Sequence, residues 1–264
     1  MNEHEDIYIT AHLSETLTGS VKAGTIISMA HKMFVSALLY LEKLYELENL
    51  DNEADFKVAE DLYDAYSISV VVLCVSALEA GINEFYEFGC GQQGAIREHL
   101  GILRDEGYLV TARYRITEKY NTVLALLKKR KFVDKKPKKS NYKGDMTQYE
   151  FDDKDYKFFQ SVENLVRLRN AIIHYNPEIY YSAKERAKIS DDFFNRLSSK
   201  FKNKRGSDGR NLPYFPSQCL GFGSAKWAVT TTFLFWEEFF NRTEVDREIN
   251  YNKLLKTSVE KWLS

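Results

Sequence analysis

One long segment constrains this chain more than any other. From Ala54 to Phe88 the apolar residues recur with a helical period and no break, and Gly89 ends the run. Its second half, SISVVVLCVSALEAGINEF, is apolar on most sides, which is typical of a helix surrounded by other helices. The uncharged stretch inside it, residues 65–78, is too short to span a bilayer, so the sequence predicts a buried core helix.

Composition extends this expectation to the rest of the chain. Only 13 Gly and 4 Pro occur among 264 residues, and a fold of many short strands needs both in its tight turns. The sequence therefore predicts an all-α protein. We expect a single α-helical domain over residues 1–264, because no linker divides the chain.

Helical periods and breaks define the remaining expected elements. Residues 1–20 lack a helical period and are expected to form an N-terminal arm or a short strand. A basic loop is predicted over residues 132–150 and a second long loop over residues 203–223. Further helices are predicted over residues 21–50, 94–105, 109–131, 155–175, 183–202, 225–241 and 246–263. The helix over 225–241 is apolar on two sides, which indicates burial in the core or between the core and a partner.

The charge balance and the cysteines bear on the cellular setting. A net charge of −1 gives no overall attraction to nucleic acid, so any such binding needs a local patch. Cys74, Cys90 and Cys219 are odd in number and far apart, which argues against a disulfide framework or a zinc site. Together with an acidic N-terminus unlike a signal peptide, they predict a cytoplasmic protein without a membrane segment, metal or cofactor.

The segment NLVRLRNAIIHYNP, residues 164–177, carries the candidate chemistry. Arg169, Asn170 and His174 lie on one predicted helix, with Asn170 and His174 four residues apart on the same face. Arg169 is about 140° from His174 by the helical period, within reach of a long guanidinium. His174 falls in the last turn, where the negative end of the helix dipole stabilises a cation.

These residue types suit a phosphodiester. Arginine binds non-bridging phosphate oxygens and stabilises charge that develops in the transition state, and histidine transfers protons near neutral pH. Asparagine orients either the imidazole or the phosphate. RNA supplies its own nucleophile in the 2′-hydroxyl, so the trio predicts RNA cleavage that needs no metal.

A structural interpretation stands beside the catalytic one. A histidine at a helix end is more often a cap than a catalyst. Arg167 is a rival arginine, seven residues before His174 on the same face, but Glu163 lies four residues before Arg167 and is placed to form an ion pair with it. A helical scaffold with a chance motif would keep Arg169 and His174 apart or pair them with carboxylates.

The run RNAIIH, residues 169–174, resembles the signature of the HEPN superfamily (higher eukaryote and prokaryote nucleotide-binding domains). That signature is an arginine, a polar residue that is often asparagine, a few apolar residues and a histidine near the end of a long helix. SALEAGINEF, residues 76–85, is similar to the helix that packs against the motif helix in many prokaryotic members. CLGFGSAKWAV, residues 219–229, is similar to a segment in some of them.

The resemblance implies a HEPN-like helical bundle with extra helices and a metal-independent endoribonuclease that leaves a 2′,3′-cyclic phosphate, with Arg169, Asn170 and His174 as the catalytic set. It also implies a homodimer whose two motifs face each other, in a bacterial toxin or anti-phage effector with an antitoxin or other partner protein. A non-catalytic HEPN module that binds a nucleotide or a protein is the alternative. Tyr175 directly follows His174, unlike the members modified on a tyrosine, so that modification is not expected.

Two further groups complete the candidate site. Ser76, Glu79 and Asn83 form a polar stripe on the apolar helix, which predicts either a layer that orients Arg169 or His174 or a structural network between helices. The basic loop offers four candidate contacts to the RNA backbone, with a merely solvated loop as the alternative. They are Lys135, Lys136, Lys138 and Lys139.

Overall fold

The computed structural model describes residues 28–50, 52–89, 115–133, 153–175, 183–204, 214–243 and 251–263. Within these ranges the regular secondary structure is helical and contains no strand, which confirms the predicted all-α fold. The arm or short strand expected over 1–20, the short helix over 94–105 and most of the basic loop lie outside the described residues.

Most predicted helices occur within a few residues of their expected bounds. The described α-helices are α1 (Met29–Glu48), α2 (Glu53–Gly89), α4 (Ile116–Leu126), α5 (Asp153–Ile173), α6 (Ala183–Leu197), α7 (Phe222–Thr243) and α8 (Tyr251–Leu263). A short π-helical turn, η1 (Tyr214–Gln218), lies within the predicted loop over 203–223, and α7 begins before that loop was expected to end.

The bounds predicted for two helices are wrong. The helix expected from residue 21 begins at Met29, because Ser28 is extended and its hydroxyl accepts a hydrogen bond from the His31 N–H as a cap. The helix expected over 109–131 is shorter at both ends. Arg115 is extended before its first turn, and Lys128, at φ 54°, stops the chain from continuing it.

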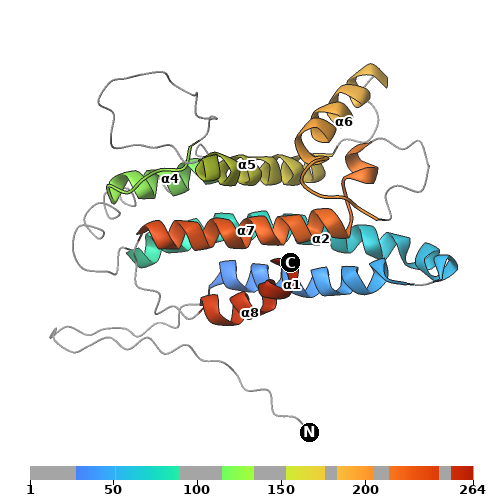
Figure 1. Ribbon diagram of the computed structural model, residues 1–264, viewed down its shortest axis with the longest axis horizontal. Coiled ribbons are helices and arrows are strands. Elements are labelled where there is room, and N and C mark those ends of the chain that lie inside the picture. The colour runs from blue at the N-terminus through green and yellow to red at the C-terminus, as the bar shows by residue number, and fades with distance from the viewer. Residues whose placement is uncertain are drawn as a thin grey trace, which may run out of the picture.

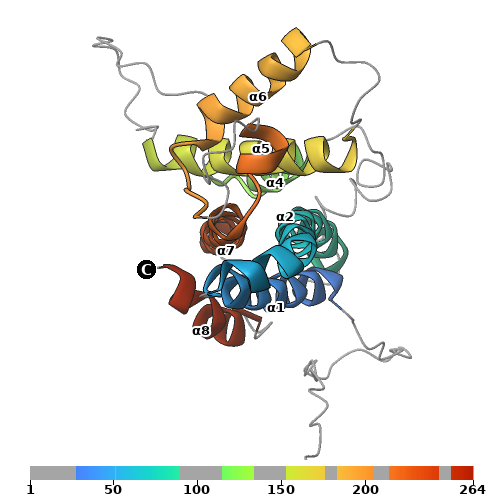
Figure 2. The ribbon, with the colours of Figure 1, turned by 90° about the vertical axis from the view of Figure 1, so that its right-hand side faces the viewer.

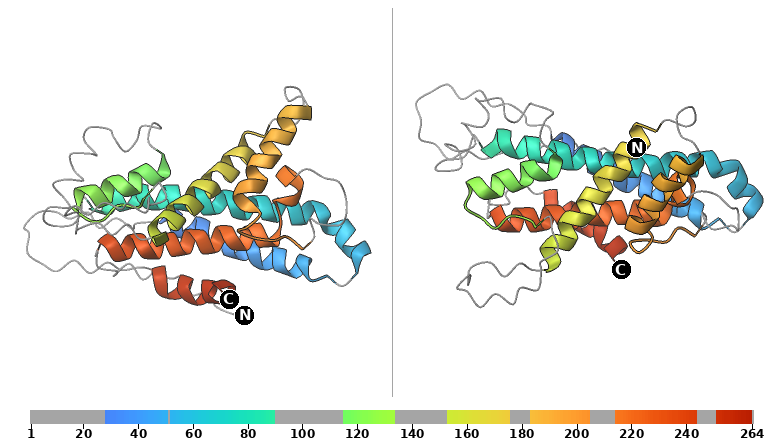
Figure 3. Two further views of the ribbon diagram at one scale, coloured as in Figure 1. Left: turned by 45° about the horizontal axis from the view of Figure 1, so that its top comes forward. Right: turned by 90° about the horizontal axis from the view of Figure 1, so that it is seen from above.

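The helices stack in three layers in the view of Figure 1. There α4, α5 and α6 form one side, α2 and α7 the middle, and α1 and α8 the other side. Seen end-on, α1, α2, α7 and α8 run along a shared direction as a bundle, whereas α5 and α6 run across it (Figure 2). From above, α5 crosses α2 and α7 obliquely and packs on both, so the motif helix rests on the two central helices (Figure 3).

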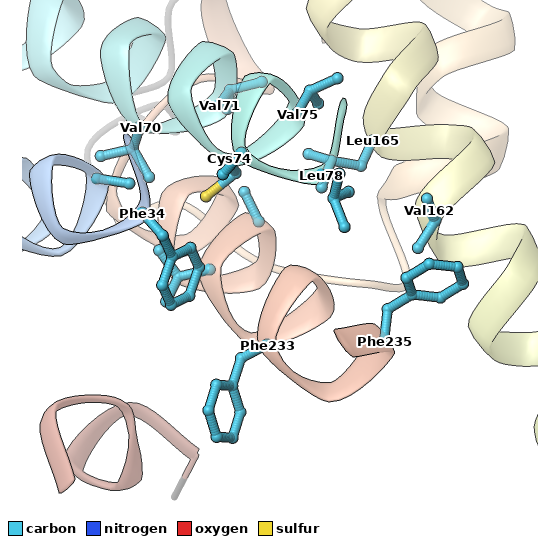
Figure 4. Close-up of a cluster of buried hydrophobic side chains, with 14 of the residues drawn as sticks. Phe34, Val70, Val71, Cys74, Val75, Leu78, Val162, Leu165, Phe233 and Phe235 are labelled. Carbon is cyan, nitrogen blue, oxygen red and sulfur yellow. The ribbon is translucent and has the colours of Figure 1, made fainter. Parts of the chain in front are cut away.

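The core forms where α2 meets its neighbours. Val70, Cys74 and Leu78 of α2 are fully buried, and Figure 4 shows them in a cluster with side chains from α1, α5 and α7. Val162 and Leu165 of α5 point into the same cluster (Figure 4). Burial of one such aliphatic side chain contributes about 1.5–3 kcal/mol, so this cluster anchors α5 firmly to the bundle.

The core helix α2 combines unusual length with an apolar composition. Over Asp55–Tyr86 this helix is long and apolar enough to cross a membrane. In its most apolar stretch of 18 residues, 44 % is buried inside the structure. The core helix of a soluble protein passes the same test of length and composition. Here α2 packs against α1, α5 and α7, which is the central role predicted for it from the sequence.

Candidate functional site

The buried face of α5 decides how the motif residues are oriented. Val162, Leu165 and Leu168 are fully buried at steps of three residues, so one side of α5 is held against α2 and α7. Because an α-helix has 3.6 residues per turn, this fixes the direction of every other side chain on it. Asn170 and His174 are therefore exposed to solvent, on one face as predicted.

His174 follows the last residue of α5 and still has helical bonding. Its backbone N–H donates to the carbonyl oxygen of Asn170 at 2.9 Å, which extends the helical pattern beyond Ile173. Its imidazole forms no hydrogen bond with another described residue and is exposed. The side chain is thus available to a ligand at the end of the helix, where the dipole stabilises a cation.

Arg169 points to a different neighbour. Its Nη2 atom lies 3.5 Å from Oε2 of Glu79 on α2, and the Arg169 side chain is only 19 % exposed. Its Nε–H group is buried and has no hydrogen-bond partner among the described residues. The guanidinium was expected to curl toward the His174 face, but in this structure it is engaged with a carboxylate across the helix interface.

The polar stripe on α2 divides between two roles. Glu79 contacts the motif through Arg169, a contact that fits an orienting layer and a structural network between helices equally. Asn83 instead accepts a hydrogen bond at 3.1 Å from the Nζ of Lys119 on α4, a mostly buried lysine, so Asn83 joins two helices. Among the described residues no hydrogen bond joins Ser76 to Arg169 or His174. Only one member of the stripe therefore touches the candidate site.

The ion pair considered between Glu163 and Arg167 is not formed. The Glu163 carboxylate accepts a hydrogen bond from the hydroxyl of Thr117, which lies in the first turn of α4. Arg167 is exposed and has no ion pair among the described residues. Its position on the face of His174 could be predicted from their spacing, but local spacing could not exclude the pair with Glu163.

Apolar and aromatic side chains lie close to His174 in the chain. Ile173 and Tyr175 are 51 % and 48 % exposed, so the end of α5 presents apolar surface to solvent on either side of His174. The ring of Tyr175 lies 5.9 Å from that of Phe215 in η1, and Phe215 stacks on Phe193 of α6. These contacts hold the end of α5 against α6 and η1.

The four lysines proposed for backbone contacts, residues 135, 136, 138 and 139, lie outside the described residues. The start of their segment is well anchored, because Arg242 of α7 donates to the carbonyl oxygens of Arg130 and Lys131 at 3.1 and 3.2 Å and lies over the ring of Phe132. Within the described ranges, no group of three or more His, Cys, Asp or Glu side chains is arranged to hold a metal ion.

Comparisons with known proteins add no further assignment. No protein-family model, no curated protein and no solved structure matches this chain. The resemblance to HEPN proteins therefore depends on the RNAIIH motif and its position at the end of a long helix.

Proposed function

We propose that the protein is a metal-independent endoribonuclease whose site is centred on His174 and Asn170, with Arg169 supplying positive charge. The observation that carries the proposal is the exposure of both Asn170 and His174 on one face at the end of α5. Because both side chains are accessible to solvent, they can contact an extended, charged substrate. Side chains in a buried polar network could not.

The chemistry requires two proton transfers. One imidazole accepts the proton of the 2′-hydroxyl as its oxygen attacks the adjacent phosphorus, and the 5′-oxygen leaves with a proton from an acid. The product strand then ends in a 2′,3′-cyclic phosphate. Asn170, one turn before His174, holds either the imidazole or a phosphate oxygen in position.

A second histidine is needed on the other side of the phosphate. One helix end cannot place a single imidazole on both sides, but a two-fold axis brings two copies of the same surface together. We therefore include a homodimer with a composite site in the proposal. Such a cleft would hold two copies of the motif and concentrate positive charge that the net charge of −1 does not supply.

Arg169 enters this mechanism only if it exchanges partners. A charge-assisted hydrogen bond is typically about 2.7–2.9 Å long, and the 3.5 Å separation from Glu79 exceeds that. Glu79 is also 47 % exposed, so water screens the pair. A phosphate, which offers a bidentate geometry, would compete well for the same guanidinium.

The same pair is what a helical scaffold with a chance motif was expected to show, and it also fits the second candidate, a non-catalytic HEPN-like module that binds a nucleotide or a protein. An arginine held by a carboxylate between two helices is also what a structural ion pair looks like. In either case the working context we propose is a cytoplasmic toxin or anti-phage effector with a partner protein that controls it.

The decisive experiment is RNA cleavage in the presence of a chelator. Wild-type protein and a His174→Ala variant are incubated with total RNA in EDTA, and the new ends are tested for 2′,3′-cyclic phosphate. We expect cleavage by the wild type and none by the variant, with equal thermal unfolding because His174 is exposed. Equal cleavage by both proteins, or activity that requires added Mg²⁺, would contradict the mechanism.

A companion experiment tests the basic loop and the dimer. Replacing Lys135, Lys136, Lys138 and Lys139 with Ser should weaken RNA binding and reduce its salt dependence if they touch phosphates.

Light scattering should give about twice the 30.8 kDa of one chain. A monomer that still cleaves RNA at nanomolar concentration would rule out the composite site.

A further inference from the structure

The exposed side of α5 carries a row of three polar residues that the motif alone does not define. Arg167, Asn170 and His174 are all exposed, at spacings of three and four residues. We infer that Arg167 is a substrate-binding residue: it binds the RNA phosphate next to the phosphate that is cleaved at His174. The inference rests on the proposed function and extends its site by one turn and one charge.

Geometry favours a neighbouring phosphate over the scissile one. Arg167 and His174 are seven residues apart, which places them within about 20° of each other around the helix and about 10 Å apart along it. Asn170 lies between them on the same face. A strand that runs along α5 would therefore meet the three side chains in order.

The surroundings of Arg167 keep its charge available. Glu163, the carboxylate one turn before it, is bonded to Thr117 of α4. Leu165 and Leu168 on either side are fully buried, so the backbone at Arg167 is held with its side chain directed outward. A phosphate at Arg167 displaces only water, because this guanidinium has no ion pair among the described residues.

Arg169 offers a direct contrast on the same helix. The Arg169 side chain is only 19 % exposed, and its guanidinium already faces the Glu79 carboxylate. Binding a phosphate there requires that an existing pair be broken. For the first contact with an incoming strand, binding a phosphate at the exposed and unpaired Arg167 costs less free energy than binding it at Arg169.

The test separates binding from cleavage by using RNA that cannot react. A labelled 2′-O-methyl RNA oligonucleotide has no free 2′-hydroxyl, so its affinity can be measured by fluorescence anisotropy over a range of salt concentrations. Wild-type protein is compared with Arg167→Ala, Arg167→Lys and Lys256→Ala. Lys256→Ala is the control. It removes one exposed positive charge from α8, which lies on the opposite side of the bundle from α5 (Figure 1).

We expect Arg167→Ala to weaken binding about tenfold, as for loss of one charged hydrogen bond, and to reduce the slope of log affinity against log salt by about one. Arg167→Lys should keep most of the slope and Lys256→Ala should keep both quantities. With cleavable RNA, Arg167→Ala should raise KM more than it lowers kcat.

Wild-type affinity and slope in Arg167→Ala would overturn the inference, even if RNA is cleaved. An Arg167-dependent affinity without any cleavage would instead contradict the nuclease and leave the binding residue in place. Absence of RNA binding by the wild-type protein would overturn both. Thermal unfolding of each variant is measured in parallel, and Arg167→Gln serves as a second uncharged variant that keeps a polar side chain.

Discussion

Glu79 of α2 and Arg169 of α5 form an ion pair, with 3.5 Å between Oε2 and Nη2, across the interface of the core helix and the motif helix. The arginine that the motif assigns to phosphate binding is thus also a link between two helices. Its contribution to stability and the contribution to RNA binding that we propose for it can be separated, because Glu79 can be neutralised without changing Arg169.

Neutralising Glu79 should release Arg169. In Glu79→Gln the guanidinium loses its charged partner, so we expect RNA affinity to rise about two- to fivefold. The free energy of unfolding should fall by less than about 1 kcal/mol, because Glu79 is half exposed and water screens the pair. RNA titration and urea unfolding measure the two effects.

The matched control is Glu46→Gln, which removes one exposed carboxylate from a pair with Lys43 on α1. It changes the net charge equally but leaves Arg169 paired. If both variants raise RNA affinity by the same factor, the effect comes from net charge and Glu79 does not restrain Arg169.

Gly223 should not tolerate a side chain. A Cβ atom there would lie 2.1 Å from the carbonyl oxygen of Lys202, which belongs to the backbone and cannot rotate away. We expect Gly223→Ala to destabilise the fold by about 1–3 kcal/mol or more. Gly81→Ala is the control, since its Cβ would meet only the side chain of Trp236, at 3.0 Å. Equal unfolding midpoints for the two variants in urea would show that the Gly223 backbone can shift.

Asp155 should be the most sensitive charged residue near the start of α5. It is 1 % exposed and binds both Arg242 of α7 and Arg130, the latter at 3.1 Å. Asp155→Asn leaves these two arginines without their shared carboxylate, one of them largely buried, and should cost about 3–5 kcal/mol.

The comparison variant for Asp155 is Asp192→Asn, which breaks the exposed pair with Arg196 on α6. Such surface pairs contribute about 0–1 kcal/mol. Chemical unfolding followed by circular dichroism measures both variants. A loss below 1 kcal/mol for Asp155→Asn would mean that the cluster is held by its other contacts.

The buried thiols should be inert while the protein is folded. Burial raises the pKa of Cys74 to about 12, and it also raises the pKa of Cys219. Since the thiolate is the reactive form, iodoacetamide at pH 8 should modify neither cysteine until the protein unfolds. Raising the pH to 9 should change the rate of modification little, because pH 9 is still far below the pKa of Cys74.

Mass spectrometry of peptides measures the modification, with guanidinium-unfolded protein as the positive control. Rapid labelling of Cys74 in native buffer would mean that α2 separates from α7 under native conditions. Thiol labelling thereby also reports on the stability of the core against which α5 packs.

The helices themselves could be predicted from the sequence. The apolar period over residues 54–88 and the break at Gly89 correspond closely to α2, and the run before Pro177 corresponds to α5. Both signals are local, because helical hydrogen bonds and the repeat of apolar residues connect positions three or four apart. The start of α1 was missed because its cap, Ser28, also depends on Glu84 of α2, whose carboxylate accepts from the Ser28 hydroxyl at 2.7 Å.

The partners of the polar residues were decided only by the tertiary structure. The sequence placed Glu163 beside Arg167, yet the Glu163 carboxylate accepts a hydrogen bond from Thr117 of α4. Arg169 faces Glu79, although these two residues are ninety positions apart. The helical period determines which residues share a face, but it does not determine which face is covered or by what. That depends on how α5 crosses α2 and α7, and burial of Val162, Leu165 and Leu168 sets this crossing: it turns Arg169 toward a carboxylate and leaves Arg167 in solvent.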